Sequence, residues 1–128
     1  MTANMANQVV WLDIPVHDLD RAIAFYSAVL GQSVHKAEGP GFALGVLPHE
    51  GDAVGGCLVV VTDGSNQPCA TGPLVYLNAN GRLDAAIAAV GPAGGQVIQP
   101  KHSIGPHGFR AVILDSEGNR LALHSATE

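Results

Sequence analysis

Asp13 and His124 are the side chains of this sequence whose types best suit acid–base chemistry. A carboxylate and an imidazole that lie side by side stabilise each other's charged form, and such a pair can move a proton to or from a bound molecule. We therefore predict Asp13 and His124 as candidate catalytic residues. The alternatives are a solvated carboxylate at a strand edge for Asp13 and a structural histidine for His124.

Trp11, Tyr76 and Asn78 are candidate ligand-binding residues, because strand alternation puts them on the same side as the acid–base pair. Successive side chains of a strand point to opposite faces. The apolar residues expected to face a helix layer are Val10, Leu12, Ile14, Val75, Leu77, Ala79, Leu121 and Leu123. The intervening residues then line one inner surface. Alternatively, Trp11 only fills space, and Tyr76 and Asn78 are wall residues satisfied by water.

The segment 100–110, PKHSIGPHGFR, is a second candidate for ligand contact. Its glycines and Pro106 indicate a turn, and Lys101 and His107 lie beside that turn. Such a loop could close over a cavity, with Lys101 attracting an anionic ligand. The alternative is a hairpin connection with a solvated basic tip.

Two similar strand–helix segments must position these side chains. LDRAIA occupies residues 19–24 and LDAAIA occupies residues 83–88. Each follows a β-rich run and has helical spacing of its apolar residues. Asp18 is expected to cap the first helix, Gly31 to end it, and Gly94–Gly95 to end the second. Further strands are predicted near 32–37, 41–47, 54–61, 95–99, 108–115 and 119–125.

The repeat predicts an α+β fold of two tandem βαβββ modules, residues 8–62 and 73–126, within one domain spanning 1–128. Four strands and one helix cannot bury both faces of a sheet alone. Two such units side by side can form a curved mixed sheet with helices outside and a concave inner face. A ligand would lie in the cavity between the modules.

The composition excludes several classes of protein. Hydrophobic residues make up 47% and charged residues 13% of the chain, which argues against disorder. A net charge of −5 with 6 Lys+Arg argues against a nucleic-acid partner. No apolar run reaches the ~18 residues of a membrane span, and residues 1–7 lack a signal-peptide layout. Two cysteines without a disulfide framework favour a cytoplasmic location.

The histidines and glycines do not form the common metal or nucleotide motifs. HExxH, GxGxxG, Walker and nucleophile-elbow patterns are absent. An unconventional cluster of His102, His107 and His124 is the remaining histidine arrangement that could hold a metal.

Three segments resemble the glyoxalase/bleomycin resistance protein/dioxygenase superfamily, also called the vicinal oxygen chelate superfamily. IPVHDLDRAIAFYSAVLG resembles its first strand–helix segment, and LDSEGNRLALHS resembles its closing hairpin and last strand. With LDAAIAAVGPAGGQVI as the second helix segment, the resemblance covers nearly the whole chain. It implies the glyoxalase/bleomycin resistance fold, whereas the reactions of this superfamily vary widely.

The resemblance also implies four inward-facing metal-ligand positions, two in each module. They correspond here to Trp11, Leu58, Leu74 and Ala122. None of these side chains can bind a metal. A register shift of one residue would introduce Cys57 as the only possible ligand. We therefore expect no metal cofactor.

Three hypotheses about function follow. The first is a binding protein that lacks the family's metal ligands and holds a small apolar molecule between the modules. The second is a glyoxalase-type lyase or isomerase, or a dioxygenase-related enzyme, which uses shifted metal ligands or the Asp13/His124 pair. The third is an oligomeric accessory domain with no ligand.

A homodimer is expected, because edge strands need to be covered and family members commonly pair. The modules could pair within one chain or between chains.

Overall fold

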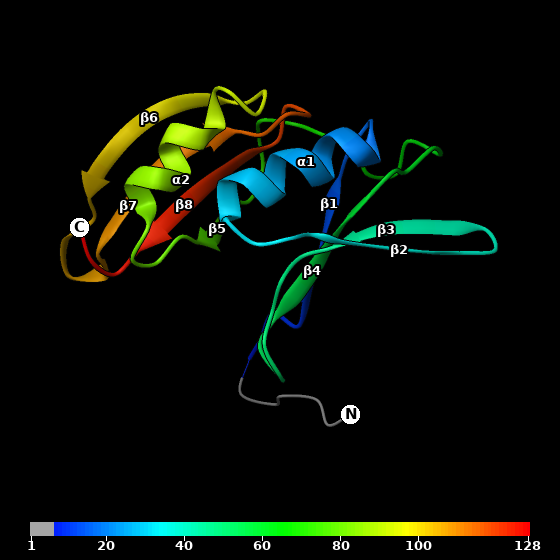
Figure 1. The fold of residues 1–128 in the computed structure, drawn as a ribbon, viewed down its shortest axis with the longest axis horizontal. Helices are drawn as coiled ribbons and strands as arrows, with labels where there is room; N and C mark the ends of the chain where they lie inside the picture. The colour runs from blue at the N-terminus through cyan, green and yellow to red at the C-terminus, as the bar shows by residue number, and fades with distance from the viewer. Residues whose placement is uncertain (1–6) are drawn as a thin grey trace.

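The structure is a computed structural model that describes residues 7–128. It contains two four-stranded mixed sheets, each with one α-helix, in the order βαβββ–βαβββ (Figure 1). The α+β fold of two tandem modules predicted from the repeat is thus confirmed. No helix among residues 7–128 is long and apolar enough to cross a membrane.

Module 1 forms sheet A, with strand order β1-β4-β3-β2. Its elements are β1 (Trp11–Pro15), α1 (Leu19–Leu30), β2 (His35–Gly39), β3 (Phe42–Val46) and β4 (Gly55–Val59). β1 and β4 run parallel, and the other neighbours are antiparallel. Asp18 caps α1 by accepting a hydrogen bond from the Arg21 amide at 3.0 Å, and Gly31 ends the helix with a φ of 69°. Both helix signals were predicted correctly.

Module 2 forms sheet B, with the matching order β5-β8-β7-β6. Its elements are β5 (Val75–Asn78), α2 (Leu83–Val90), β6 (Gln96–Ser103), the 3₁₀ turn η1 (Gly105–His107), β7 (Phe109–Leu114) and β8 (Arg120–Ser125). α2 ends at Val90, earlier than the predicted stop at Gly94–Gly95, because Gly91 already begins a turn. The Gly95 amide closes that turn on the Val90 carbonyl at 2.8 Å.

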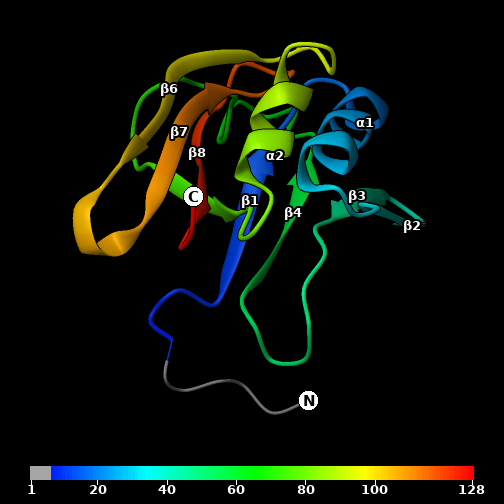
Figure 2. The same ribbon diagram turned by 60° about the vertical axis from the view of Figure 1, so that its left-hand side comes forward.

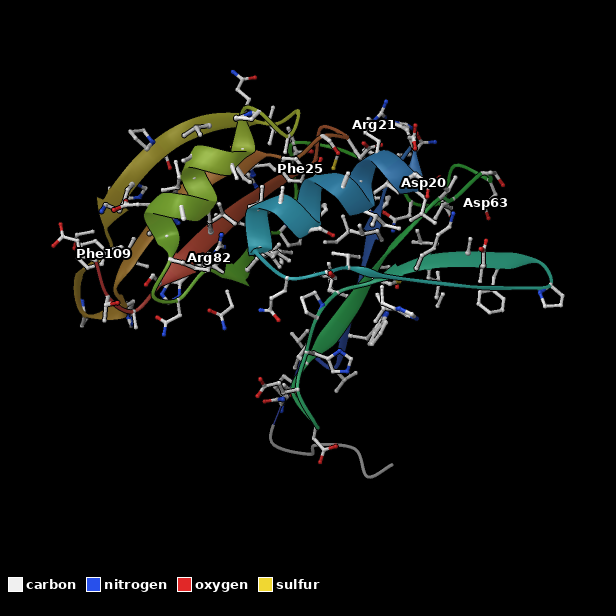
Figure 3. All side chains as sticks on the ribbon, in the orientation of Figure 1. Asp20, Arg21, Phe25, Asp63, Arg82 and Phe109 are labelled. Carbon is white, nitrogen blue, oxygen red and sulfur yellow. The ribbon has the colours of Figure 1, made fainter. Side chains whose placement is uncertain are left out.

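The two helices lie side by side over the sheets, and Figure 2 shows sheet B curving behind α2. One apolar core joins both modules through this helix layer. It includes Phe25 and Val29 of α1 and Ala86 and Val90 of α2. It also includes strand residues that face the helices, such as Leu58, Ile113, Leu121 and Leu123. Phe25, labelled in Figure 3, is fully buried and packs close to Gly95 of module 2. Burial of this shared core couples the stability of the two modules.

A buried polar network ties the start of α1 to the β7–β8 turn. The Glu117 carboxylate accepts hydrogen bonds from the amides of His17 and Asp18 at 2.8 and 2.9 Å and forms an ion pair with Arg21 at 2.7 Å. Asp115, in the same turn, accepts a hydrogen bond from the Tyr26 hydroxyl of α1. Burial alone would raise the pKa of Glu117, but these donors outweigh it and lower the pKa to about 2.

The sheets do not continue into each other. β1 and β5 are edge strands, and the register of residues 7–128 pairs β1 only with β4 and β5 only with β8. The predicted curved mixed sheet is therefore realised as two separate sheets, whose edge strands β1 and β5 do not pair. This division determines where the candidate site residues lie.

Candidate functional site

The inner face of module 1 carries Trp11, Asp13 and Cys57. The Trp11 indole N–H donates to Asp13 Oδ1 at 3.0 Å, and the Cys57 thiol donates to the same oxygen at 3.3 Å. Parallel pairing of Asp13 with Cys57 places these two side chains next to each other. A Cβ on Gly55 would lie 3.2 Å from the Trp11 ring, so a larger residue there would require the ring to shift slightly. This face is acidic and its polar groups bond to one another.

The Cys57 thiol is not set up as a nucleophile. Burial raises its pKa to about 11, and the hydrogen bond and negative charge of Asp13 act in the same direction. A thiol acts as a nucleophile in its thiolate form, which this environment disfavours. The Asp13–Cys57 contact is therefore a structural link between β1 and β4.

The inner face of module 2 carries a row of nitrogen-bearing side chains across all four strands. Asn78 of β5 pairs with His124 of β8, His124 pairs with Arg110 of β7, and Arg110 pairs with His102 of β6. Residues that pair across neighbouring strands share a face of the sheet. The four side chains therefore form one transverse line on sheet B.

Tyr76 lies one step along β5 from this row. Its hydroxyl accepts a hydrogen bond from Arg110 Nη1, and the guanidinium carbon lies 5.8 Å from the ring centroid. The Tyr76 and His124 rings meet edge to face, with centroids 6.1 Å apart. Tyr76 is still 46% exposed. It thus presents an aromatic surface whose polar edge is already held in place.

Two hollows meet at Tyr76. An open pocket of about 480 Å³ is lined by Tyr76, Ile104, His107 and His124. A cleft of about 560 Å³ between the modules is also lined by Tyr76, together with apolar side chains from both sheets and the 47–54 loop. Those side chains include Val9, Leu12, Leu47, Val54, Leu74, Val75 and Leu77. An apolar cleft that opens onto a few polar groups is the usual form of a small-molecule site.

The residues predicted from the sequence thus fall into two sets instead of one inner surface. Trp11 and Asp13 lie on sheet A, whereas Tyr76, Asn78 and His124 lie on sheet B. The prediction of a single surface was wrong for one chain, because β1 and β5 do not pair. The alternation itself was correct: Ile14, Leu121 and Leu123 are core residues, and Trp11 and Tyr76 are exposed.

Asp13 and His124 do not contact each other in this chain. Asp13 accepts from Trp11 and Cys57, while His124 Nε2 lies 2.7 Å from the His107 carbonyl oxygen, to which it donates. Their catalytic role stays a prediction, and within one chain each has a separate partner.

The remaining predicted residues also separate. His107 reaches the pocket at Tyr76 and His124. Asn78 accepts a hydrogen bond from the Asn80 amide at 2.8 Å and lines a hollow with His49 and Glu50. Lys101 forms an ion pair with Asp84 of α2 at 2.9 Å, so its ammonium group lies on the helix side of sheet B.

The donor set on these faces does not fit a divalent metal. In module 1 Asp13 pairs with Cys57, and in module 2 Tyr76 pairs with Ala122. Because Asp13 and Tyr76 hold matching positions on β1 and β5, Cys57 is the module 1 counterpart of Ala122. The ligand position assigned to Leu58 is therefore corrected to Cys57, and Leu58 is buried in the core. Among residues 7–128 no three His, Cys, Asp or Glu side chains form a group that could hold a metal ion. Trp11, Leu74 and Ala122 offer no ligand atoms.

Sequence reasoning missed Arg110, and it considered His102, the partner of Arg110, only as a member of a possible histidine metal cluster. Arg110 interrupts the apolar strand FRAVIL, in which Ala111 and Ile113 are fully buried toward the helices. By alternation, Arg110 belongs to the inner face. A single arginine at an inner position of an apolar strand was the signal that could have identified it.

Comparison with known proteins agrees with this architecture. Residues 8–44 match the family model described as bleomycin resistance protein-like N-terminal. No curated protein matches the chain significantly. Among solved structures, a glyoxalase/bleomycin resistance protein from Albidiferax ferrireducens T118 has a TM-score of 0.72 and 18% identity, covering 93% of this chain and 98% of that one.

Two further structures are similar over most of their length. A glyoxalase-related enzyme from Fulvimarina pelagi has a TM-score of 0.69 and 16% identity, covering 92% of this chain and 87% of that one. UcmS2 has a TM-score of 0.66 and 25% identity, covering 94% and 98%. The N-terminal match and the shared two-module architecture together show that this chain has the fold of the glyoxalase/bleomycin resistance proteins.

Proposed function

We propose that this protein binds a small, mostly apolar organic molecule without a metal, at the junction of the inter-module cleft and the inner face of module 2. The observation that carries the proposal is the position of Tyr76, a half-exposed ring shared by the apolar cleft and the pocket containing His107 and His124. An exposed aromatic ring between two hollows is a natural stacking surface for a flat ligand.

The superfamily's metal-centred chemistry has no support in the residues of these faces, because the four ligand positions carry Trp11, Cys57, Leu74 and Ala122. Binding would therefore depend on shape, aromatic contact and a few polar groups. The family match at residues 8–44 to a bleomycin resistance-like segment is consistent with a protein that holds its ligand without converting it.

Isothermal titration of 1-naphthamide, a flat and neutral probe, tests this function. We expect protein dialysed against EDTA to bind the probe, and Tyr76→Ala to weaken binding about tenfold through loss of ring contact. Phe42→Ala is the matched control, because Phe42 of β3 is an aromatic residue of similar exposure, 53% against 46%, on the other sheet. Binding that requires a divalent metal, or a stoichiometric metal that survives dialysis, would contradict the proposal.

A homodimer in the cytoplasm is part of the same proposal. Val9 and Val10, just before β1, and Trp11, its first residue, expose apolar side chains at 63, 66 and 46%. Unpaired edge strands with apolar side chains tend to be covered by a partner. The two free cysteines are consistent with a reducing compartment. Light scattering after gel filtration tests the dimer, and a monomer at micromolar concentration would contradict it.

A further inference from the structure

Among residues 7–128, Arg110 has no carboxylate partner; Arg82 and Arg120 have none either, but they donate to the main-chain carbonyls of Val29 and Gly72. Arg21, Lys36 and Lys101 each form an ion pair with an acidic side chain. Arg110 forms none with the acidic groups of residues 7–128, although the chain as a whole carries a net charge of −5. A half-buried cation without a counter-ion loses hydration that no opposite charge replaces.

The Arg110 guanidinium is nevertheless fixed in position by neutral groups. Its Nε donates to His102 Nε2 at 3.0 Å, and its Nη1 donates to the Tyr76 hydroxyl. An arginine only donates, so His102 Nε2 must accept, and the ring's proton then sits on Nδ1, which donates to the Pro100 carbonyl at 2.9 Å. His102 is thus held as a neutral acceptor that orients Arg110.

The arrangement leaves most of the guanidinium free. Two of the five N–H groups of an arginine are used by His102 and Tyr76, and the rest have no protein partner among residues 7–128. His124 is the neighbour of Arg110 on β8 and donates through Nε2 to the His107 carbonyl. Its Nδ1 has no hydrogen-bond partner among residues 7–128. A preorganised guanidinium next to an aromatic ring is well suited to a carboxylate carried by a flat ligand.

We propose that the binding site takes an aromatic carboxylate, with the ligand's ring against Tyr76 and its carboxylate on Arg110. This inference rests on the proposed function and adds the charge of the ligand to it. The apolar cleft then holds the body of the ligand, and the Asn78–His124–Arg110–His102 row faces its acidic end.

Titration calorimetry with 1-naphthoate and its neutral counterpart 1-naphthamide tests the charge preference. Wild-type protein should bind the carboxylate at least about tenfold more tightly than the amide, since a charge-assisted bond to a half-buried, preoriented arginine exceeds a neutral one. Arg110→Gln should remove that preference. Lys36→Gln, which removes the same charge from the exposed β2 strand, should preserve the preference.

His102 is a positioning residue in this account. His102→Phe should reduce the preference for the carboxylate, and His102→Gln, which keeps an acceptor atom, should restore most of it. Should Arg110→Gln fail to fold, Arg110→Lys provides the second variant. Lysine keeps the positive charge but lacks the planar guanidinium with its two parallel donors, so this variant should show an intermediate preference for the carboxylate.

The outcomes separate the two proposals. Equal binding of the two probes by wild type, or a preference that survives Arg110→Gln, overturns the carboxylate assignment and leaves the proposed binding function standing. Binding of neither probe overturns both. A third outcome would also contradict the proposal. If the wild type forms a dimer but does not bind 1-naphthoate, and if Arg110→Gln and Asp13→Asn each dissociate that dimer, then Arg110 pairs with the Asp13 carboxylate of a second copy.

Discussion

Modules 1 and 2 have the same βαβββ topology, yet their inner faces differ in charge and in how their polar groups are used. On sheet A, Asp13 is saturated by Trp11 and Cys57. On sheet B, Arg110 is oriented by two neutral partners and retains free donors. The two modules therefore share a topology, whereas one inner face carries the Asp13 carboxylate and the other carries the Arg110 guanidinium. Polar groups whose hydrogen bonds are all made within the protein stabilise its structure. Polar groups that are held in place but keep free donors are the ones available to a ligand.

The helices differ in the same way. α1 has 12 residues, an Asp18 cap and a buried carboxylate, Glu117, at its start. α2 has 8 residues, and its N-cap, Arg82, makes no capping bond with its side chain. Arg82, labelled at the start of α2 in Figure 3, instead donates to the Val29 carbonyl of α1 at 2.6 Å. The α1 end should therefore carry the stronger tie between the modules.

Glu117→Gln should have the largest effect on stability. Removing the charge weakens the ion pair with Arg21 and the bonds from two amides, and we expect a loss of about 2–3 kcal/mol in urea unfolding at pH 7. Arg82→Gln, at the corresponding tie of α2, should cost about 1 kcal/mol because it removes one bond to a carbonyl. Equal losses would contradict the assigned asymmetry between the modules.

The same carboxylate predicts a pH dependence. The pKa of Glu117 is lowered in the folded protein from 4.5 to about 2, so its contribution is fully present above pH 4.5. That contribution is lost as the pH falls from about 4.5 toward about 2. The stability difference between wild type and Glu117→Gln should therefore shrink over this window, measured by urea unfolding at successive pH values. A constant difference would show that the charge is not responsible.

Gly95→Ala should be the next most disruptive change, and Gly91→Ala is its matched control. A Cβ on Gly95 would meet the Leu114 carbonyl oxygen and lie 2.6 Å from the Phe25 ring, whereas a Cβ on Gly91 meets nothing within 4 Å. We expect Gly95→Ala to destabilise by about 2 kcal/mol. Gly91 has helical dihedral angles (φ −62°, ψ −52°), but it precedes Pro92, which disfavours a Cβ in that conformation, so Gly91→Ala should change the stability by less than about 0.5 kcal/mol. Thermal unfolding of the two variants measures both effects.

The thiols sharpen the description of the sheet A face. Cys57 is buried and its pKa is raised to about 11, whereas Cys69 is exposed. At pH 8, iodoacetamide should modify Cys57 at least about tenfold more slowly than Cys69, followed by peptide mass spectrometry. Asp13→Asn should accelerate Cys57 severalfold, because it removes the negative charge that disfavours the thiolate. Fast modification of Cys57 in wild type would mean that this face is open and reactive.

Lys101→Gln should have the smallest effect on binding. Lys101 and Arg110 lie on neighbouring strands of sheet B, yet Lys101 pairs with Asp84 on the helix side. We expect less than a twofold change in 1-naphthoate affinity from Lys101→Gln, because the ammonium group points away from the pocket. A loss as large as that of Arg110→Gln would restore the sequence-based prediction that Lys101 attracts the anion.

The fold was predictable from local signals, and the site only in part. Strand alternation correctly assigned the faces of Ile14, Tyr76 and Leu123, because burial on one face strongly constrains a strand. What alternation cannot supply is the relation between two sheets. The modules pack through contacts that lie far apart in sequence, such as Phe25 near Gly95 and Tyr26 with Asp115. The Leu58 assignment failed for a related reason, since a fixed repeat offset ignores differences in loop length between the modules.

Amide chemical-shift mapping of the EDTA-treated protein with 1-naphthoate tests the central claim most directly. The largest shifts are expected at Tyr76, Arg110 and His124, without added metal, because the ligand should occupy the inner face of module 2. Shifts that centre on Trp11, Asp13 and Cys57, or that appear only after a divalent metal is added, would contradict it.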